Sequence, residues 1–355
     1  MEQFKQLDFS GQTIFVGIDV HKKSWRVSLR SQHVELKTFS QNPSAGELCS
    51  HLKREYPRAD YRLVYEAGFC GFHFQRAFER AGISCIIVNP ADIPTSDKDR
   101  RRKSDTIDCR KLSRTLSEGN LKGIFVPSVE QQDDRGIVRA YNQMVKNQTR
   151  CKNQIKGLLN FQGIDSPFAV NGGHWPNNYL TWLAELPLGP SARINLDILL
   201  ENYRNSRSMV LACTRQLRLL ASGERNRETI SLLRTIPGVG LVTSVLLALE
   251  IGDVNRFGSF DQLCSFVGLV PNVSGSGDSE HVLGLTNRAH HQLREKLIEA
   301  SWIAVRRDPA ITMAFGEYAK RMNKNRAIIK VARKMIARIR FVLKNRAAYV
   351  TAVVK

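Results

Sequence analysis

The sequence lacks a long apolar run, a secretion signal and the cysteine spacing of a zinc site. No uninterrupted apolar stretch approaches the ~18 residues that span a bilayer, and the opening residues MEQFKQLDFSGQ lack the basic-then-apolar pattern of a signal peptide. The seven cysteines are scattered, with no Cys-x-x-Cys pair and no histidine partner at zinc spacing. These absences argue against a membrane or secreted protein and predict reduced thiols in a cytoplasm.

Acidic residues are scarce beside basic ones. The chain has 33 Asp and Glu against 53 Lys and Arg, a formal net charge of +20 and a pI near 9.9. The basic charge is clustered, because residues 98–103 read KDRRRK and residues 319–355 contain twelve Lys or Arg and no acid. Clustered positive charge indicates a polyanionic partner. A generally basic soluble protein is the alternative.

The apolar pattern of residues 1–125 predicts an α/β domain. Strands are expected at 12–18, 25–30, 33–39, 61–66 and 84–88, with helices at about 43–56, 72–81 and 104–118. The first three strands form an antiparallel meander, and the next two follow helical crossovers and therefore run parallel. This order predicts a fold of the ribonuclease H type.

The rest of the chain is predicted to be all-α. Heptad spacing from Ile137 to Leu158 predicts a long helix, which either forms a coiled coil between protomers or packs on its own domain. Residues 161–200 are expected to be irregular around a short helix. The predicted parts are a helical connector at 126–225, a C-terminal domain at 226–320 and a basic helix at 321–355.

Four acidic residues stand where a chain can gather carboxylates around divalent cations. Asp19 would lie on the first, central strand and Glu66 at the end of a parallel neighbour, while Asp105 and Asp108 share one helix face. Any one of them alone could be a solvated surface residue, but Asp19 inside an apolar strand resists that explanation. Two Mg²⁺ (or Mn²⁺) ions about 4 Å apart would offset the repulsion and support in-line phosphoryl transfer.

Two C-terminal elements have the character of backbone-binding structures. Gly238 and Gly240 lie in a PGVG turn between apolar helices, where backbone N–H groups can hold a phosphate. The last helix is apolar on one face and basic on the other. A plain turn and a solvated helix face are the alternatives. The residues predicted to contact nucleic acid are Lys22, Lys23, Arg100, Arg101, Arg102, Lys103, Gly238, Gly240, Lys330, Arg333 and Lys334.

The motifs GIDVHKKSW, YEAG and KSDTIDCRKL, together with TIPGVGLVTSVLLALEIGDVNRFGSFDQLCSFVGLVPNVSGSG, resemble the insertion-sequence one-ten family of transposases. The resemblance covers most of the chain, with 161–225 the least distinctive part. It implies a RuvC-like domain with an Asp-Glu-Asp-Asp metal site, a C-terminal transposase domain and a place in the prokaryotic cytoplasm with the nucleoid. The implied metal ligands are Asp19, Glu66, Asp105 and Asp108.

The resemblance also implies that Ser276 attacks a phosphate and forms a transient phosphoserine link to DNA. Such an ester conserves the phosphodiester bond energy, so strands are exchanged without ATP. The family often has a second hydroxyl residue beside the serine and then Gly and Lys, whereas residues 275–278 read GSGD, so Ser274 is a competing nucleophile. The family's lysine, glycine and asparagine ahead of the next helix are replaced by Asn287, Ala289 and His290.

The partners implied by the resemblance are double-stranded DNA, a structured noncoding guide RNA and further copies of the chain in a dimer or tetramer. Base pairing would choose the sequence while the basic protein holds backbones. Three alternatives stay open: a Piv-type DNA invertase, a junction nuclease with water as nucleophile, and an inactive nucleic-acid-binding remnant. The DNA flanking the gene, rather than the protein sequence, separates a transposase from an invertase.

Overall fold

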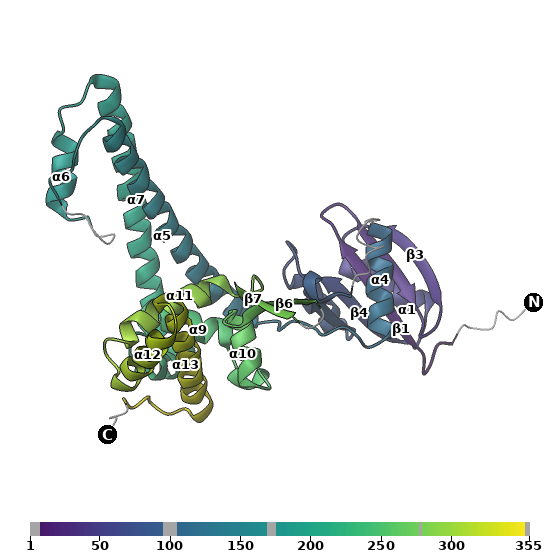
Figure 1. Ribbon diagram of the computed structural model, residues 1–355. Helices are drawn as coiled ribbons and strands as arrows, with labels where there is room; N and C mark the ends of the chain where they lie inside the picture. The colour runs from purple at the N-terminus through teal and green to yellow at the C-terminus, as the bar shows by residue number, and fades with distance from the viewer. Residues whose placement is uncertain (1–7, 95–104, 169–174, 277–278, 352–355) are drawn as a thin grey trace, which may run out of the picture. The chain divides into compact units, whose positions relative to one another are not determined.

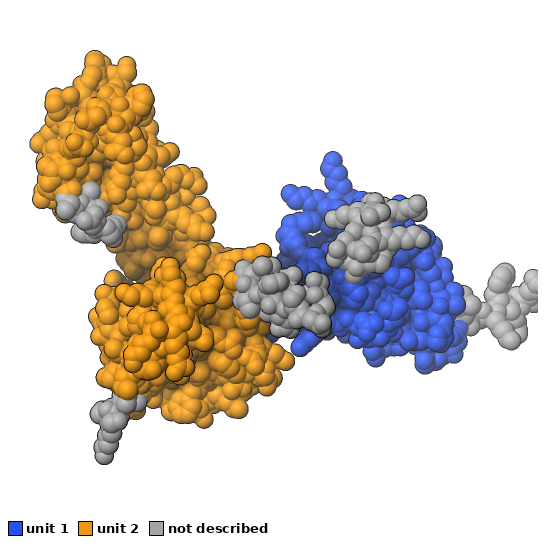
Figure 2. All heavy atoms as spheres, in the orientation of Figure 1, with its two compact units in different colours: residues 1–127 blue, residues 128–355 orange. Residues whose placement is uncertain are grey.

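A computed structural model describes residues 8–94, 105–168, 175–276 and 279–351 of the chain. These fall into two compact units, residues 1–127 and 128–355, which are coloured separately in Figure 2. The KDRRRK segment lies outside the described residues, with the predicted contacts Arg100, Arg101, Arg102 and Lys103.

The first unit is a five-stranded sheet with helices on both faces (Figure 1). Its strands are β1 (Thr13–Val20), β2 (Trp25–Arg30), β3 (Glu35–Gln41), β4 (Asp60–Glu66) and β5 (Ser84–Val88). Its helices are α1 (Ala45–Glu55), α2 (His73–Arg80), the short η1 (Pro90–Asp92) and α4 (Asp105–Ser117).

The strand order β3-β2-β1-β4-β5 confirms the predicted mixed α/β sheet. Strands β1, β2 and β3 are antiparallel neighbours, whereas β4 and β5 run parallel to β1. This topology is consistent with the predicted ribonuclease H-like fold. It makes β1 the central strand, with neighbours on both sides.

Strand β1 is apolar on both faces because helices cover both. Ile14, Val16 and Ile18 are fully buried in one core with residues of α1 and α2. The alternate positions of β1, including Gly17, face α4. Because both faces are covered, a carboxylate on β1 is partly shielded from water wherever it lies.

The second unit is built mainly of helices. They are α5 (Val129–Phe161), α6 (Asn177–Glu185), α7 (Pro190–Ser222), α8 (Glu224–Leu233), α9 (Leu241–Ile251), the short η2 (Val254–Arg256), α10 (Phe260–Val267), α11 (His291–Ala304), α12 (Pro309–Arg321) and α13 (Lys324–Asn345). Its two strands are β6 (Pro271–Ser276) and β7 (Ser279–Leu285).

Helices α5 and α7 pack along each other, with α6 at the far end of the pair (Figure 1). Cys151 and Ile155, two positions of the predicted heptad pattern, are buried in a core shared with α6 and α7. The seam at these positions is therefore a contact within the chain. The α8–turn–α9 pair joins α11 and α13 in a separate, larger core.

Two sequence predictions for this unit were wrong. Residues 190–200 were expected to be irregular, but they begin α7, where Pro190 at the first helical turn has the backbone angle and missing N–H that suit a helix start. The C-terminal half was expected to be purely helical, but β6 and β7 form an antiparallel hairpin. Its Gly- and Ser-rich sequence has weak strand propensity, so the local pattern did not reveal it.

None of the helices within the described residues combines the length and apolar character that a membrane crossing requires.

Candidate active site

Asp19, His21 and Asp105 meet at the end of the central strand of the first unit. The His21 Nε2 atom lies 3.1 Å from an Asp19 carboxylate oxygen and 3.7 Å from one of Asp105. One potential ligand atom from each of the three residues lies within 4.8 Å of the others. Asp19 belongs to β1 and Asp105 is the first residue of α4. Residues 86 positions apart are thus joined in one polar cluster.

Gly17 explains how α4 reaches this position. A Cβ atom at residue 17 would collide with the backbone of Cys109 and Ser113, so the backbone of α4 lies directly on β1. A buried hydrogen bond between the hydroxyls of Ser28 on β2 and Ser113, at 3.0 Å, holds the helix on the sheet. Asp105 is one helical turn before Cys109, which brings it to the end of β1 where Asp19 stands.

The other two predicted acids belong to the same region. Ile18 pairs with Tyr65 in the parallel β1–β4 ladder, so Asp19 and Glu66 are the next residues on neighbouring strands. Residues in register on parallel strands have side chains on the same face. The negative charge of Asp108 is close enough to raise the pKa of Asp19. Glu66 therefore ends β4 at the same end of the sheet as Asp19. Among the described residues, however, the group with ligand atoms within 4.8 Å of one another contains Asp19, His21 and Asp105 and neither Glu66 nor Asp108.

Burial is the main reason that the pKa of Asp19 is raised above its ordinary value. His21 opposes the shift through its charge and its hydrogen bond, while Asp105 and Asp108 add to it. The ionised Asp19 is thus poorly compensated by the protein alone. Carboxylate oxygens with one imidazole nitrogen are a donor set that suits a divalent metal ion. The residues present therefore fit such an ion.

Sequence reasoning did not assign His21 and Gly17 their positions here. The sequence analysis predicted nucleic-acid contacts at the next two residues, Lys22 and Lys23. The structure leaves both lysines exposed in the β1–β2 connection, two or more residues beyond the strand that carries Asp19. The signal for Gly17 was present, because a glycine within a buried strand often marks a close backbone approach.

The predicted serine lies in the second unit, at the end of the β6–β7 hairpin. Ser276 is the last paired residue of β6, opposite Ser279, and Ser274 pairs with His281. β6 thus runs up to Ser276, and residues 277–278 of the GSGD sequence lie outside the described part of the chain. The competing serines occupy different positions: Ser276 closes the ladder, and Ser274 is two residues nearer its base.

The base of this hairpin is tied to α11. Arg294 of α11 donates to the carbonyl oxygens of Thr286 at 2.8 Å and Gly268 at 3.3 Å, on the two sides of the hairpin. The Thr286 N–H donates to the Val270 carbonyl oxygen at 3.0 Å. Rotation of the hairpin about its base would break these bonds.

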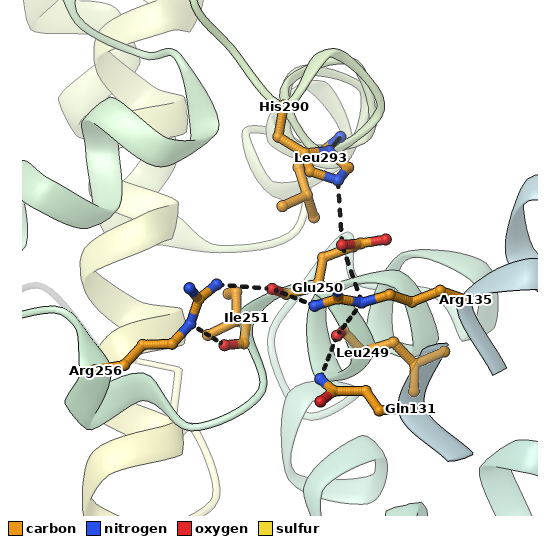
Figure 3. Close-up of polar contacts among 8 residues, drawn as sticks. All are labelled: Gln131, Arg135, Leu249, Glu250, Ile251, Arg256, His290 and Leu293. Carbon is orange, nitrogen blue, oxygen red and sulfur yellow. Dashed lines mark hydrogen bonds and ion pairs between the residues drawn. The ribbon is translucent and has the colours of Figure 1, made fainter. Parts of the chain in front are cut away.

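A buried polar network stands beside that base and gathers at the C-terminal end of α9 (Figure 3). Arg135 of α5 donates to the Leu249 carbonyl oxygen at 3.0 Å and forms an ion pair with Glu250 at 3.2 Å. Gln131 also donates to Leu249, at 2.7 Å, and Arg256 donates to the carbonyl oxygens of Glu250 and Ile251. Cations at these carbonyls complement the negative end of the helix dipole.

His290 joins the network to α11. Its Nδ1 atom accepts from the Leu293 N–H at 3.2 Å, as an N-cap does, which assigns the ring proton to Nε2. Nε2 lies 3.4 Å from a Glu250 carboxylate oxygen. Burial pushes the pKa of Glu250 up, but His290 and Arg135 outweigh it and hold the pKa below its ordinary value. His290, which departs from the family pattern, thus caps α11 and binds Glu250.

The predicted nucleic-acid contacts of the second unit fall into two groups. Gly238 has a positive φ of 88° and no space for a Cβ against the backbone of Ala300, so its glycine is needed for packing on α11. Gly240 is the N-cap of α9 and has open space around it. Lys330, Arg333 and Lys334 lie on α13.

A mixed α/β unit with clustered acids, followed in the chain by a helical unit, is consistent with a transposase of the DEDD type. The family model for transposases of the DEDD type in IS110 elements matches residues 16–162. The model described as the transposase IS116/IS110/IS902 family matches residues 230–315. The chain belongs to this family of insertion-element transposases.

Curated relatives carry the same designation. The putative transposase y4qE of Sinorhizobium fredii is 29% identical over 293 residues, covering 81% of this chain and 71% of the relative. The transposase for insertion sequence element IS1111A of Coxiella burnetii is 25% identical over 276 residues, covering 77% and 74%. The putative transposase y4rJ of S. fredii is 26% identical and covers 91% and 90%.

Proposed function

We propose that this transposase cuts and joins DNA strands at the ends of its element by transferring a phosphoryl group to a serine hydroxyl. The observation that carries the proposal is the cluster of Asp19, His21 and Asp105 at the end of the central strand. The two family matches support it, because one spans the four acids and the other spans Ser276.

In the proposed reaction, Asp19, Glu66, Asp105 and Asp108 hold divalent cations, Mg²⁺ or Mn²⁺. When bound, such ions supply positive charge beside the phosphate oxygens. The Ser276 Oγ atom forms a bond to phosphorus as a phosphorus–oxygen bond of the DNA breaks. The serine gives up its proton and the departing sugar oxygen gains one. Lys22 and Lys23, both exposed beyond Asp19, would hold neighbouring phosphates by charge.

The acid assignment is tested by Asp19→Asn, Glu66→Gln, Asp105→Asn and Asp108→Asn, each assayed for recombination of a plasmid that carries the element ends. Each is expected to abolish recombination while circular dichroism shows an intact fold. Asp60→Asn is the matched control, because Asp60 is an exposed acid at the opposite end of β4. Near-normal recombination by any two of the four variants would refute the metal-site assignment.

The nucleophile is tested by a protein–DNA adduct that survives denaturing electrophoresis. Ser276→Ala is expected to remove the adduct and Ser274→Ala to keep it. Loss with Ser274→Ala alone would move the assignment two residues toward the hairpin base. Metal-dependent nicking by the wild type without an adduct would favour the junction nuclease. Binding of DNA with every substrate left intact would favour the inactive remnant.

We further propose that a structured noncoding RNA guides the reaction and that the active form is a dimer or tetramer. The test is to express the gene with its native flanking DNA and to sequence the RNA that copurifies. One discrete RNA from the flank is expected, and its loops would identify the DNA to be recombined. A heterogeneous mixture of host RNA would mean that the +20 charge binds polyanions without selection, and the unguided invertase would then be favoured.

A further inference from the structure

A pocket of about 360 Å³ opens on the second unit between α10, α12 and α13. Its size is at the lower end of the range for small-ligand sites, ~300–1,000 Å³. Two aromatic rings and three cationic side chains line it. The lining residues are Phe260, Tyr318, Lys330, Arg333, Lys334 and Ala337.

The cations are placed against the aromatic rings. The Lys330 ammonium lies 5.4 Å from the centre of the Tyr318 ring, and the Arg333 guanidinium lies 5.6 Å from that of Phe260. Lys334 is one helical turn after Lys330 and is exposed. Among the described residues, the pocket's cations form one ion pair, between Arg333 and Asp261 at 3.0 Å. The pocket therefore has an excess of positive charge.

Arg333 also connects the pocket to the serine hairpin. Its second guanidinium nitrogen donates to the Leu269 carbonyl oxygen at 2.9 Å, two residues before β6 begins. With both nitrogens engaged, Arg333 is a fixed wall of the pocket. Lys330 and Lys334 are left as the cations whose flexible ammonium groups can follow a ligand.

Aromatic faces beside lysines match the chemistry of a nucleotide, which has a flat base and a charged phosphate. In a duplex the bases are stacked on one another, so a ring at the protein surface can take only an unpaired base. We propose that this pocket binds one unpaired nucleotide, with its base against Tyr318 and Phe260 and its phosphate on Lys330 and Lys334. This rests on the proposed function only in that the ligand is nucleic acid.

The test measures equilibrium binding by the full chain in EDTA, so that it is independent of strand cleavage. The probes are fluorescein-labelled hexamers of thymidine and of uridine and a blunt 12-base-pair duplex. Tyr318→Ala is expected to weaken binding of a hexamer about tenfold and duplex binding less than about twofold. Tyr318→Phe should retain hexamer binding. Phe161→Ala, which removes a ring that is 87% exposed on α5, is the control and should change neither.

Lys330→Ala is expected to weaken hexamer binding and to reduce the slope of log K against log salt by about 0.7, whereas Lys146→Ala on α5 should leave hexamer binding at the wild-type level. A preference for thymidine would identify DNA as the source of the nucleotide, and a preference for uridine would identify RNA. Either supports the pocket if it depends on Tyr318. Equal losses on hexamer and duplex with Tyr318→Ala, or no loss on either, would overturn the proposal.

A second measurement needs no variant. A hexamer containing 4-thiothymidine is photocrosslinked to the wild-type protein and the adduct is mapped by mass spectrometry. Crosslinks at Tyr318 or Phe260 are expected, and crosslinks confined to other elements would contradict the assignment. If the wild type forms no serine adduct but binds the hexamer through Tyr318, the proposed reaction is rejected and the pocket is left standing.

Discussion

At the scale of single residues, Gly17 positions the acids without touching any ligand. Gly17→Ala places a methyl group against the backbone of Cys109 and Ser113. Since backbone cannot yield as a side-chain tip can, we expect α4 to shift and the free energy of unfolding to fall by about 1–3 kcal/mol. Recombination should fall further than stability does, because Asp105 and Asp108 move with the helix.

The control for this change is Gly46→Ala in α1, where a Cβ meets only ordinary contacts. Alanine there should be neutral or stabilising by up to about 1 kcal/mol. Thermal unfolding and recombination are measured on both variants. A Gly17→Ala protein with wild-type unfolding temperature and activity would mean that the close approach of α4 has no role in the site.

At Asp19, the charge that the proposed function needs lowers the stability of the fold. Its pKa in the folded protein is raised, first by burial and then by Asp105 and Asp108. The folded state therefore prefers the protonated form, and ionised Asp19 destabilises the metal-free protein at pH above that pKa. We expect Asp19→Asn to be at least as stable as the wild type at pH 7 in EDTA, although it is inactive.

Addition of Mg²⁺ should reverse the order. Ions that bind only the folded state raise its unfolding temperature. Mg²⁺ should therefore raise the unfolding temperature of the wild type and change that of Asp19→Asn little. The experiment is a thermal unfolding series with and without Mg²⁺. A loss of stability for Asp19→Asn in EDTA would show that the carboxylate is well compensated by the protein itself.

At the scale of elements, the C-terminal end of α9 depends on charges that come from other segments. Arg135 and Glu250 are both less than 10% exposed. Removal of one partner from a buried pair leaves an uncompensated charge, so Arg135→Ala should cost about 3–5 kcal/mol. Arg204→Ala removes the exposed pair with Glu201 and should cost less than about 1 kcal/mol. Urea unfolding of the two variants makes the comparison.

The same network predicts that the protein loses stability at low pH. Because the folded-state pKa of Glu250 is held below its ordinary value of 4.5, the pair stabilises the protein fully above that value and loses its effect as pH falls through the folded-state pKa. The urea midpoint of the wild type should therefore decline below about pH 4.5 more steeply than that of Glu250→Gln. If the urea midpoints of the two proteins fall in parallel with pH, Glu250 does not contribute to the loss of stability in acid.

The elements that the sequence predicted well are those with periodic apolar patterns. The strands Trp25–Arg30 and Ser84–Val88 match their predicted bounds to the residue, because buried strands read as apolar runs between turn residues. The β6–β7 hairpin was missed because cross-strand pairing overrides its weak local preference for a strand. The start of α7 was missed although Pro190 suits the first turn of a helix. The four acids were found from motifs, but the contact of His21 with two of them depends on how α4 crosses the sheet.

At the scale of the whole molecule, the two units have separate hydrophobic cores. Trp25, Leu48 and Phe78 belong to a core made only of residues before 128, while α9 and α13 centre another made only of later ones. We expect residues 1–127 to fold alone and the full chain to unfold in two steps. Trp25 is the only tryptophan of the first unit. A variant with Trp175, Trp182 and Trp302 replaced by Phe therefore reports the unfolding of the first unit by fluorescence. A single transition in all probes would contradict this.

The charge of +20 sets how the molecule meets any nucleic acid. Each phosphate that a lysine or arginine neutralises releases counterions, so the affinity for a non-specific duplex should fall about 10³- to 10⁵-fold between 50 and 200 mM salt if ~6–10 phosphates are contacted. Replacing Arg100, Arg101, Arg102 and Lys103 by Ala should reduce the slope of log K against log salt by up to about four, one for each lost contact.

The control variant removes the same charge from another place, the basic residues Lys146, Arg150, Lys156 and Arg215 of α5 and α7. If the two quadruple variants lose the same slope, the effect belongs to net charge and not to the KDRRRK segment. A larger loss for the KDRRRK variant, measured by fluorescence anisotropy, would assign to this segment a direct contact with the DNA backbone.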